Sequence, residues 1–147
     1  MNRLIGSLYR LCFVGFALIL FVGCPETSKL VQVTGKITVD GKPANGASVL
    51  FFPEGSGGEV AAGSADANGQ FTLVSNMEPG IAPGKYKVTV TWPDPAKRPS
   101  TEDIAMGRAK DAPDILKGKF VNKDRSTLSV EITATTKELP PLELISK

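Results

Sequence analysis

The chain has 147 residues, of which 41% are hydrophobic, and this is enough apolar material for one domain of ordinary size. Its 17 basic and 15 acidic residues nearly balance, so its charge does not predict a nucleic acid as a partner. The sequence contains no histidine, which excludes Ser-His and Cys-His catalysis and the usual zinc sites. We therefore expect a protein without enzymatic activity, cofactor or metal.

The first 23 residues have the layout of a secretory signal peptide. Arg3 and Arg10 form a basic start, and residues 11–22 are an uninterrupted apolar run. This run is well short of the ~20 residues that a membrane-spanning helix needs. A buried core helix is the alternative interpretation, but the run has no polar face. We therefore expect residues 1–23 to direct export and to lie outside the folded domain.

The end of this leader, Phe21-Val-Gly-Cys24, resembles the lipobox of bacterial lipoproteins, although the family usually has Leu where Phe21 stands. The resemblance implies that the Cys24 thiol receives a diacylglycerol, that cleavage occurs before it, and that its new amine is acylated, for example with palmitate. Two or more acyl chains give a durable membrane anchor. The chain would then be a lipoprotein of the bacterial cell envelope, at the outer membrane or facing the periplasm. The alternative is a secreted protein with a free Cys24.

Cysteine content agrees with a lipid anchor. Cys12 would leave with the signal peptide, so the mature chain would keep only Cys24 and could form no internal disulfide. Residues 24–30 would form a short tether, which keeps the domain at 31–147 close to its membrane.

The stretch from Val33 to Pro53 predicts two strands. Apolar residues alternate with polar ones from Val33 to Val39, the period of a half-buried strand. Asp40-Gly41 provides turn chemistry, and Val49–Phe52 is a second apolar run. Because the connection is short, we expect these strands to lie side by side, with later strands supplying the opposing sheet.

Three further strands are expected between residues 59 and 92. Residues 59–65 form a weakly apolar strand, and Asn68-Gly69 predicts a type I′ hairpin that leads into residues 70–74. Residues 85–92 are the clearest strand, because their apolar and polar side chains alternate strictly. Its inward side chains are Tyr86, Val88, Val90 and Trp92.

Residues 93–126 read as a long irregular insertion that contains four prolines, with a short helix capped near Ser100. Strands at 127–133 and 139–145 close the chain. Pro140-Pro141 confines the last one to a sheet edge or to a bulge. Seven short strands separated by Gly, Pro and Asn turns predict an all-β fold, a seven-stranded antiparallel β-sandwich with Greek-key, immunoglobulin-like connections.

Three phrases in order look like carboxypeptidase-regulatory-like, or transthyretin-like, domains. They are Val33 to Pro53, Asp66 to Phe71 and Pro83 to Val90. Residues 116–120 and 128–132 are similar to the tail of small bacterial lipoproteins that carry one such domain. The resemblance implies a prealbumin-like sandwich that acts as a non-catalytic envelope module. The purine-breakdown hydrolases of this fold class rely on histidines, which this chain lacks.

Two features could carry binding chemistry. Asp66, Asn68 and Gly69 are similar to the start of a calcium loop, but Met77 stands where the closing acidic residue belongs, so we interpret them as a turn. Trp92 and Tyr86 could stack on a sugar ring, but their phase with Val88 and Val90 places them in the core.

The insertion also carries a mildly basic stretch. We interpret it as a solvated loop, with contact to anionic lipid or acidic polymer as the alternative. Its members are Arg108, Lys110, Lys117, Lys119, Lys123 and Arg125.

The sequence therefore predicts a lipid-anchored, non-catalytic binding or structural module of the cell envelope, with Cys24 as its one site residue. The alternative is a carbohydrate-binding module at the cell surface that uses the 93–126 loop and aromatic residues at the sheet edge. The expected partners are the membrane, through the anchor, and an envelope polysaccharide or protein.

Overall fold

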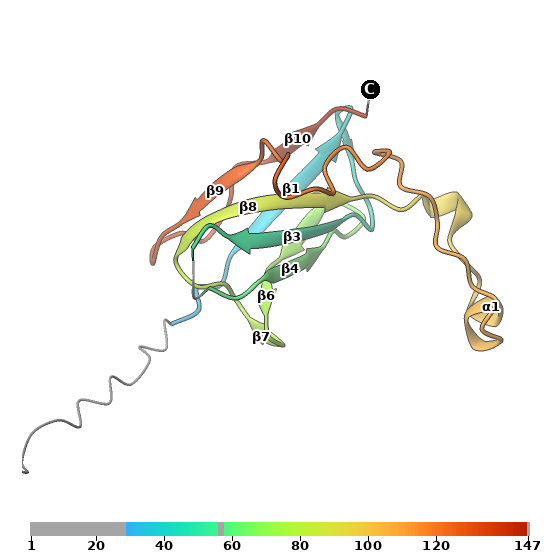
Figure 1. Cartoon of the computed structure of the whole chain (residues 1–147), viewed down its shortest axis with the longest axis horizontal. Coiled ribbons are helices and arrows are strands. Elements are labelled where there is room, and N and C mark those ends of the chain that lie inside the picture. The colour runs from blue at the N-terminus through green and yellow to red at the C-terminus, as the bar shows by residue number, and fades with distance from the viewer. Residues whose placement is uncertain (1–28, 56–57, 147) are drawn as a thin grey trace, which may run out of the picture.

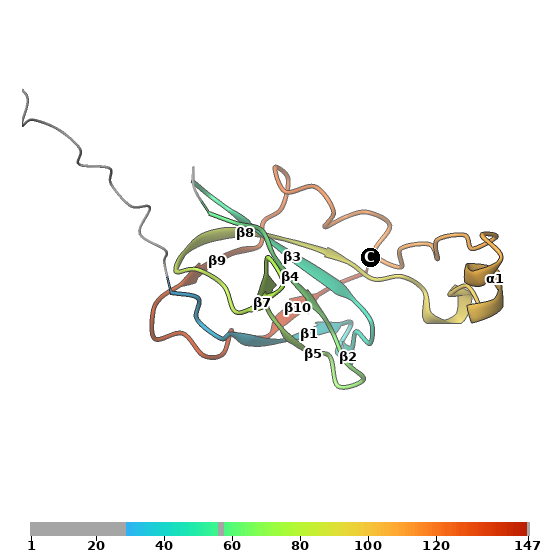
Figure 2. The same cartoon turned by 90° about the horizontal axis from the view of Figure 1, so that it is seen from below.

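The computed structural model describes residues 29–55 and 58–146, so the predicted signal peptide and Cys24 lie outside the described residues. The described part is built mainly from two β-sheets, which are visible in two perpendicular views (Figures 1 and 2). The predicted all-β character is confirmed.

The larger sheet has six strands in the order β7-β6-β4-β3-β8-β9, and all of its neighbours run antiparallel. In that order the strands are β7 (Glu78–Pro79), β6 (Val74–Ser75), β4 (Ala61–Ser64), β3 (Ser48–Pro53), β8 (Gly84–Thr91) and β9 (Ser129–Ile132). The pairing of β3 with β8 is the longest, because six residues of β3 face six of β8.

The smaller sheet is centred on β1 (Thr34–Val39). On one side β1 pairs with β10 (Leu142–Leu144), and on the other it pairs with β2 (Lys42–Pro43) and β5 (Gln70–Thr72). The pairing with β10 is parallel, which departs from the expected antiparallel arrangement. β10 is nevertheless the edge strand that Pro140-Pro141 predicted.

The expectation that the first two long strands lie side by side is wrong, because β1 and β3 belong to opposite sheets. Asp40 and Gly41 both have positive φ, 50° and 76°, and they turn the chain back for only two residues of β2. Pro43 has no N–H with which to continue the ladder. The buried, small Ala44 and Ala47 then let the chain cross to the other sheet.

The predicted strand at residues 70–74 is also divided between the sheets. β5 pairs with β1, whereas β6 pairs with β4 and β7. The preceding turn is not the expected type I′ turn, because only Gly69 of the Asn68-Gly69 pair has positive φ, at 76°. The carboxylate of Asp66 instead accepts the N–H groups of Asn68 and Gln70, each at 2.8 Å.

The core fills the space between the sheets with alternate residues of each strand. Val49 and Phe51 of β3 and the predicted Val88 and Val90 of β8 are fully buried. Phe51 lies 6.3 Å, centroid to centroid, from both Phe71 and the buried Tyr86. The aromatic trio therefore joins the two sheets.

Glycines make room for the ring of Phe71. A Cβ added to Gly35 of β1 would lie 2.4 Å from the ring, and one added to Gly63 of β4 would lie 3.0 Å from it. Phe71 therefore fits only because both neighbouring strands lack a side chain at these positions.

The predicted insertion divides into two parts. Residues 95–112, here called the arm, contain a 3₁₀ helix, η1 (Pro95–Lys97), and α1 (Thr101–Ala105), and neither helix has a buried residue. The predicted cap of α1 is confirmed, because Ser100 Oγ accepts the N–H of Asp103 at 3.1 Å. In Figures 1 and 2 the arm projects from the sandwich at the end opposite to residue 29. Residues 113–128 return along β8.

Candidate functional site

Cys24, the predicted lipidation site, lies outside the described residues, as does most of the tether. Only Lys29 and Leu30 of the tether are described. No helix within 29–55 or 58–146 is long and apolar enough to cross a membrane.

Tyr86, in β8, and Trp92, which directly follows β8, both contribute to the folded structure. Tyr86 is 1% exposed, its hydroxyl donates to the Ala82 carbonyl at 2.8 Å, and burial raises the pKa of its phenol. Trp92 is half-buried against the core, and its Nε1 donates to the Asn45 carbonyl at 3.1 Å. The core interpretation is confirmed for Tyr86, and Trp92 lies at the rim of the core.

The base of the arm is fastened to the turn at Asn45-Gly46. Arg98 Nη2 donates to the Gly46 carbonyl at 3.2 Å and lies 3.5 Å from that of Asn45, which also accepts Trp92 Nε1. Gly46 has φ +74°, and a Cβ there would overlap the Arg98 guanidinium. The arm is therefore fixed at its base while its tip stays away from the core.

The returning segment is ordered by the carboxylate of Asp114. Its Oδ1 accepts the N–H of Trp92 at 2.9 Å and that of Leu116 at 3.1 Å, and its Oδ2 accepts the N–H of Gly118 at 2.8 Å. These bonds join the end of β8 to the loop that covers it. Leu116, 1% exposed, is thereby held in the core.

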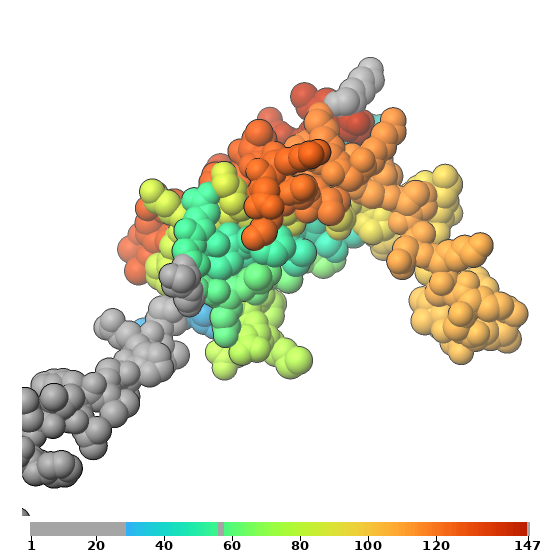
Figure 3. Space-filling view, in the orientation of Figure 1, coloured from blue at the N-terminus to red at the C-terminus, as the bar shows by residue number. Residues whose placement is uncertain are grey.

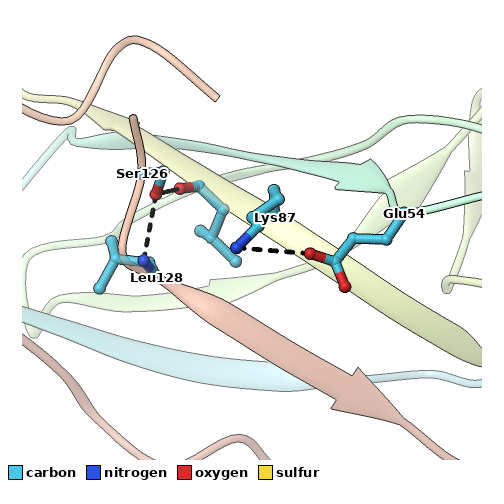
Figure 4. Close-up of polar contacts among 5 residues, drawn as sticks. Glu54, Lys87, Ser126 and Leu128 are labelled. Carbon is cyan, nitrogen blue, oxygen red and sulfur yellow. Dashed lines mark hydrogen bonds and ion pairs between the residues drawn. The ribbon is translucent and has the colours of Figure 1, made fainter. Parts of the chain in front are cut away.

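A second polar anchor joins this loop to β8 (Figure 4). The buried Ser126 hydroxyl donates to the Val88 carbonyl and accepts the N–H of Leu128. Close by, Lys87 Nζ lies 3.4 Å from Glu54 Oε1. The ion pair borders a small hollow of about 300 Å³, whose other walls include Phe52, Pro53, Lys123 and Asp124.

A larger hollow of about 510 Å³ lies over β1 and β5. The exposed side chains of both strands line it together with acidic groups, and the aromatic ring among its residues, Phe71, is buried. Its lining side chains offer hydrogen bonds of both kinds and charges of both signs. They include Thr34, Lys36, Gln70, Thr72, Asp66 and Glu138.

No protein-family model matches this chain, and no curated protein is significantly similar to it.

The Asp66 carboxylate stabilises the turn in which it lies, because one of its oxygens accepts two backbone N–H groups, as the turn interpretation predicts. Within the described residues, no group of three or more Asp, Glu, Cys or His side chains is arranged to hold a metal ion.

The six side chains of the basic stretch are exposed, as both the solvated-loop interpretation and contact with an anionic surface require. Arg108 pairs with Asp103 at 3.6 Å, and Lys119 lies 5.5 Å above the Phe120 ring. Its members are divided between the arm and the returning segment, so they do not form one continuous element.

Sequence reasoning missed three residues that organise the insertion: Arg98, Asp114 and Ser126. Each acts on backbone groups that are distant in sequence or in a turn, and side-chain periodicity does not report such contacts. The one local signal is Asp114 shortly before Gly118, where Lys117 and Gly118 have positive φ of 54° and 74°.

Proposed function

We propose that this chain is a lipid-anchored, non-catalytic binding or structural module of the bacterial cell envelope, acylated at Cys24. The observation that carries the proposal is the leader of residues 1–23, whose last residue, Gly23, is followed directly by Cys24. The structure adds that Val31 already pairs with Ile81, so the domain begins seven residues after the proposed anchor.

The proposal includes a transthyretin-like domain with a seven-stranded Greek-key plan. Three of the ten described strands, β2, β6 and β7, have two residues each, and the other seven have three or more. The phrases behind the resemblance fall on structural positions: Val33 to Pro53 contains β1 to β3, Asp66 to Phe71 turns into β5, and Pro83 to Val90 lies in or next to β8.

The test is replacement of the proposed acylation site. Cys24→Ala is expected to abolish incorporation of labelled palmitate and to leave the leader uncleaved, and Cys12→Ala is the matched control that should be processed like the wild type. Mass spectrometry of the mature amino terminus measures both outcomes. A wild-type chain that starts upstream of Cys24 with a free thiol would refute the proposal.

A second candidate function, carbohydrate binding at the cell surface, is favoured by one observation, the open polar hollow over β1 and β5. Hydroxyl and amide side chains such as those of Thr34 and Gln70 can exchange hydrogen bonds with sugar hydroxyls. Trp92 is less suited, because its indole N–H is already bonded to Asn45.

Calorimetric titration with envelope polysaccharide fragments tests this second function. Gln70→Ala should weaken binding, whereas Ser129→Ala, on the other sheet, should not. Equal binding by the wild type and both variants would exclude the hollow as the binding site.

A further inference from the structure

The β6–β7 hairpin presents the most exposed large hydrophobic side chain of the described residues. Met77 at its tip is 97% exposed, whereas the next most exposed, Ile145, is 62% exposed. In the space-filling view, the yellow-green hairpin projects from the lower side of the domain (Figure 3). Methionine is flexible and adapts to irregular apolar surroundings, so it suits a soft contact surface.

The tip of this hairpin is a two-residue turn with positive φ at both residues. Asn76 and Met77 have φ of 50° and 68°, in the left-handed region. Asn tolerates this region, but Met pays roughly 1 kcal/mol there. Positive φ at both residues is what a two-residue hairpin turn of type I′ requires, so the backbone conformation belongs to the hairpin. The Met77 side chain, in contrast, is almost fully exposed, so the stability of the domain does not explain it.

The hairpin is fixed to the point where the chain joins the domain. Val31 and Ile81 exchange backbone hydrogen bonds of 2.9 and 3.0 Å. The N–H of Gly80 donates to the Leu73 carbonyl at 2.8 Å, and the hydroxyl of the buried Ser75 donates to the Gly80 carbonyl at 2.8 Å. The tip therefore cannot move away from Val31 without breaking these bonds.

The length of chain before Val31 sets how far this end lies from the anchor. Six residues lie between Cys24 and Val31, and the seven steps from one to the other span at most about 25 Å when fully extended. The arm projects from the opposite end of the domain (Figures 1 and 3). A membrane attached through Cys24 is thus within reach of the hairpin, which lies nearer to this end of the domain than the arm does (Figures 1 and 2).

We propose that the Met77 tip of the β6–β7 hairpin rests on the lipid surface that holds the anchor and orients the domain on it. This proposal rests on the proposed function. The flanking Asn76 and Glu78 are polar and exposed, so the contact is shallow, at the boundary between headgroups and acyl chains. The arm, with its exposed Ile104 and Met106, then points away from the membrane.

Methionine oxidation of the acylated wild-type protein tests the contact without any substitution. On exposure alone, Met77 at 97% should react with aqueous chloramine-T faster than Met106 at 57%. In vesicles of phosphatidylethanolamine and phosphatidylglycerol, membrane contact should reverse this order. Peptide mass spectrometry of the sulfoxides measures both rates. Oxidation of Met77 that remains faster than that of Met106 in vesicles would overturn the proposal.

A second measurement uses the thiols of the same chain. In an acylated protein the sulfur of Cys24 is a thioether, so Met77→Cys would carry the one free thiol of the mature chain. A fluorophore there should be quenched by nitroxide lipids with shallow labels, and the Ile104→Cys control should not be. Quenching at position 104 alone would overturn the hairpin contact. Labelling of the wild-type protein would show instead that the anchor itself is wrong, and the hairpin contact would fall with it.

Discussion

Replacing Asp114 by alanine is expected to destabilise the domain by about 2 kcal/mol. The wild-type carboxylate accepts three backbone N–H groups, from Trp92, Leu116 and Gly118. Alanine leaves these donors without their acceptor and frees the loop that covers the end of β8.

The magnitude depends on which donors can turn to water. A hydrogen bond to a buried charged group is worth about 1.5–3 kcal/mol, but Asp114 is only half-buried, so we take about 1 kcal/mol each for the Trp92 and Leu116 amides. Gly118 is exposed and its N–H can bond to water, so we assign no loss of stability to that amide. For a domain of this size, 2 kcal/mol corresponds to a loss of about 8 °C in melting temperature.

Urea unfolding followed by tryptophan fluorescence measures the change, because Trp92 is the only tryptophan in the sequence and adjoins the site. Asp111→Ala is the matched control, an exposed carboxylate nearby, and should change stability by less than about 0.5 kcal/mol. Asp114→Asn, which keeps one acceptor oxygen, should fall between the two. A free energy of unfolding for Asp114→Ala within about 0.5 kcal/mol of the wild-type value would refute this role of the carboxylate.

Three further substitutions address other parts of the fold. Burial raises the pKa of the Tyr86 phenol above its usual 10, so the unfolded chain loses this proton first and the stability should fall as the pH rises past 10. Tyr86→Phe should reduce that fall in urea unfolding measured at alkaline pH. An unchanged dependence of stability on pH would contradict the linkage. Gly35→Ala should lower the free energy of unfolding by about 2 kcal/mol, because its Cβ would lie 2.4 Å from the Phe71 ring. In a double-mutant cycle, adding Phe71→Leu should recover part of this loss. Strictly additive effects of the two substitutions would contradict the clash. Ser126→Ala should lower the free energy of unfolding by about 1–2 kcal/mol, measured by thermal unfolding, because it removes a buried, hydrogen-bonded hydroxyl. The control Ser129→Ala, at an exposed position, should match the wild type. Equal melting temperatures of the two variants would show that the Ser126 hydroxyl does not stabilise the domain.

The sequence predicts the faces of strands well because alternation is a local property. Tyr86, Val88 and Val90 are buried on one face of β8, as their spacing indicates, and Ile132 and Leu144 are buried in the closing strands. The cap at Ser100 also follows from local chemistry, since its hydroxyl meets an N–H only three residues away.

Partner strands could not be predicted in the same way. Alternation is identical whether β1 pairs with β3 or faces it across the core, and the choice depends on the two-residue ladder of β2 and on the small Ala44 and Ala47. The candidate hollow over β1 and β5 exists only because β5 joins β1, so no local pattern announces it. The role of Asp114 is hidden for the same reason, since Trp92 lies 22 residues away in the chain.

The parallel ladder between β1 and β10 bears on when the protein can finish folding. Ile37, Thr38 and Val39 find their partners only in Leu142, Glu143 and Leu144, more than a hundred residues later. A ribosome therefore releases the central strand of the smaller sheet long before the neighbour that completes it, and closing so long a loop is slow. Until residues 142–144 are free to pair, this edge of β1 has no partner strand, which exposes the incomplete domain to edge pairing with other chains.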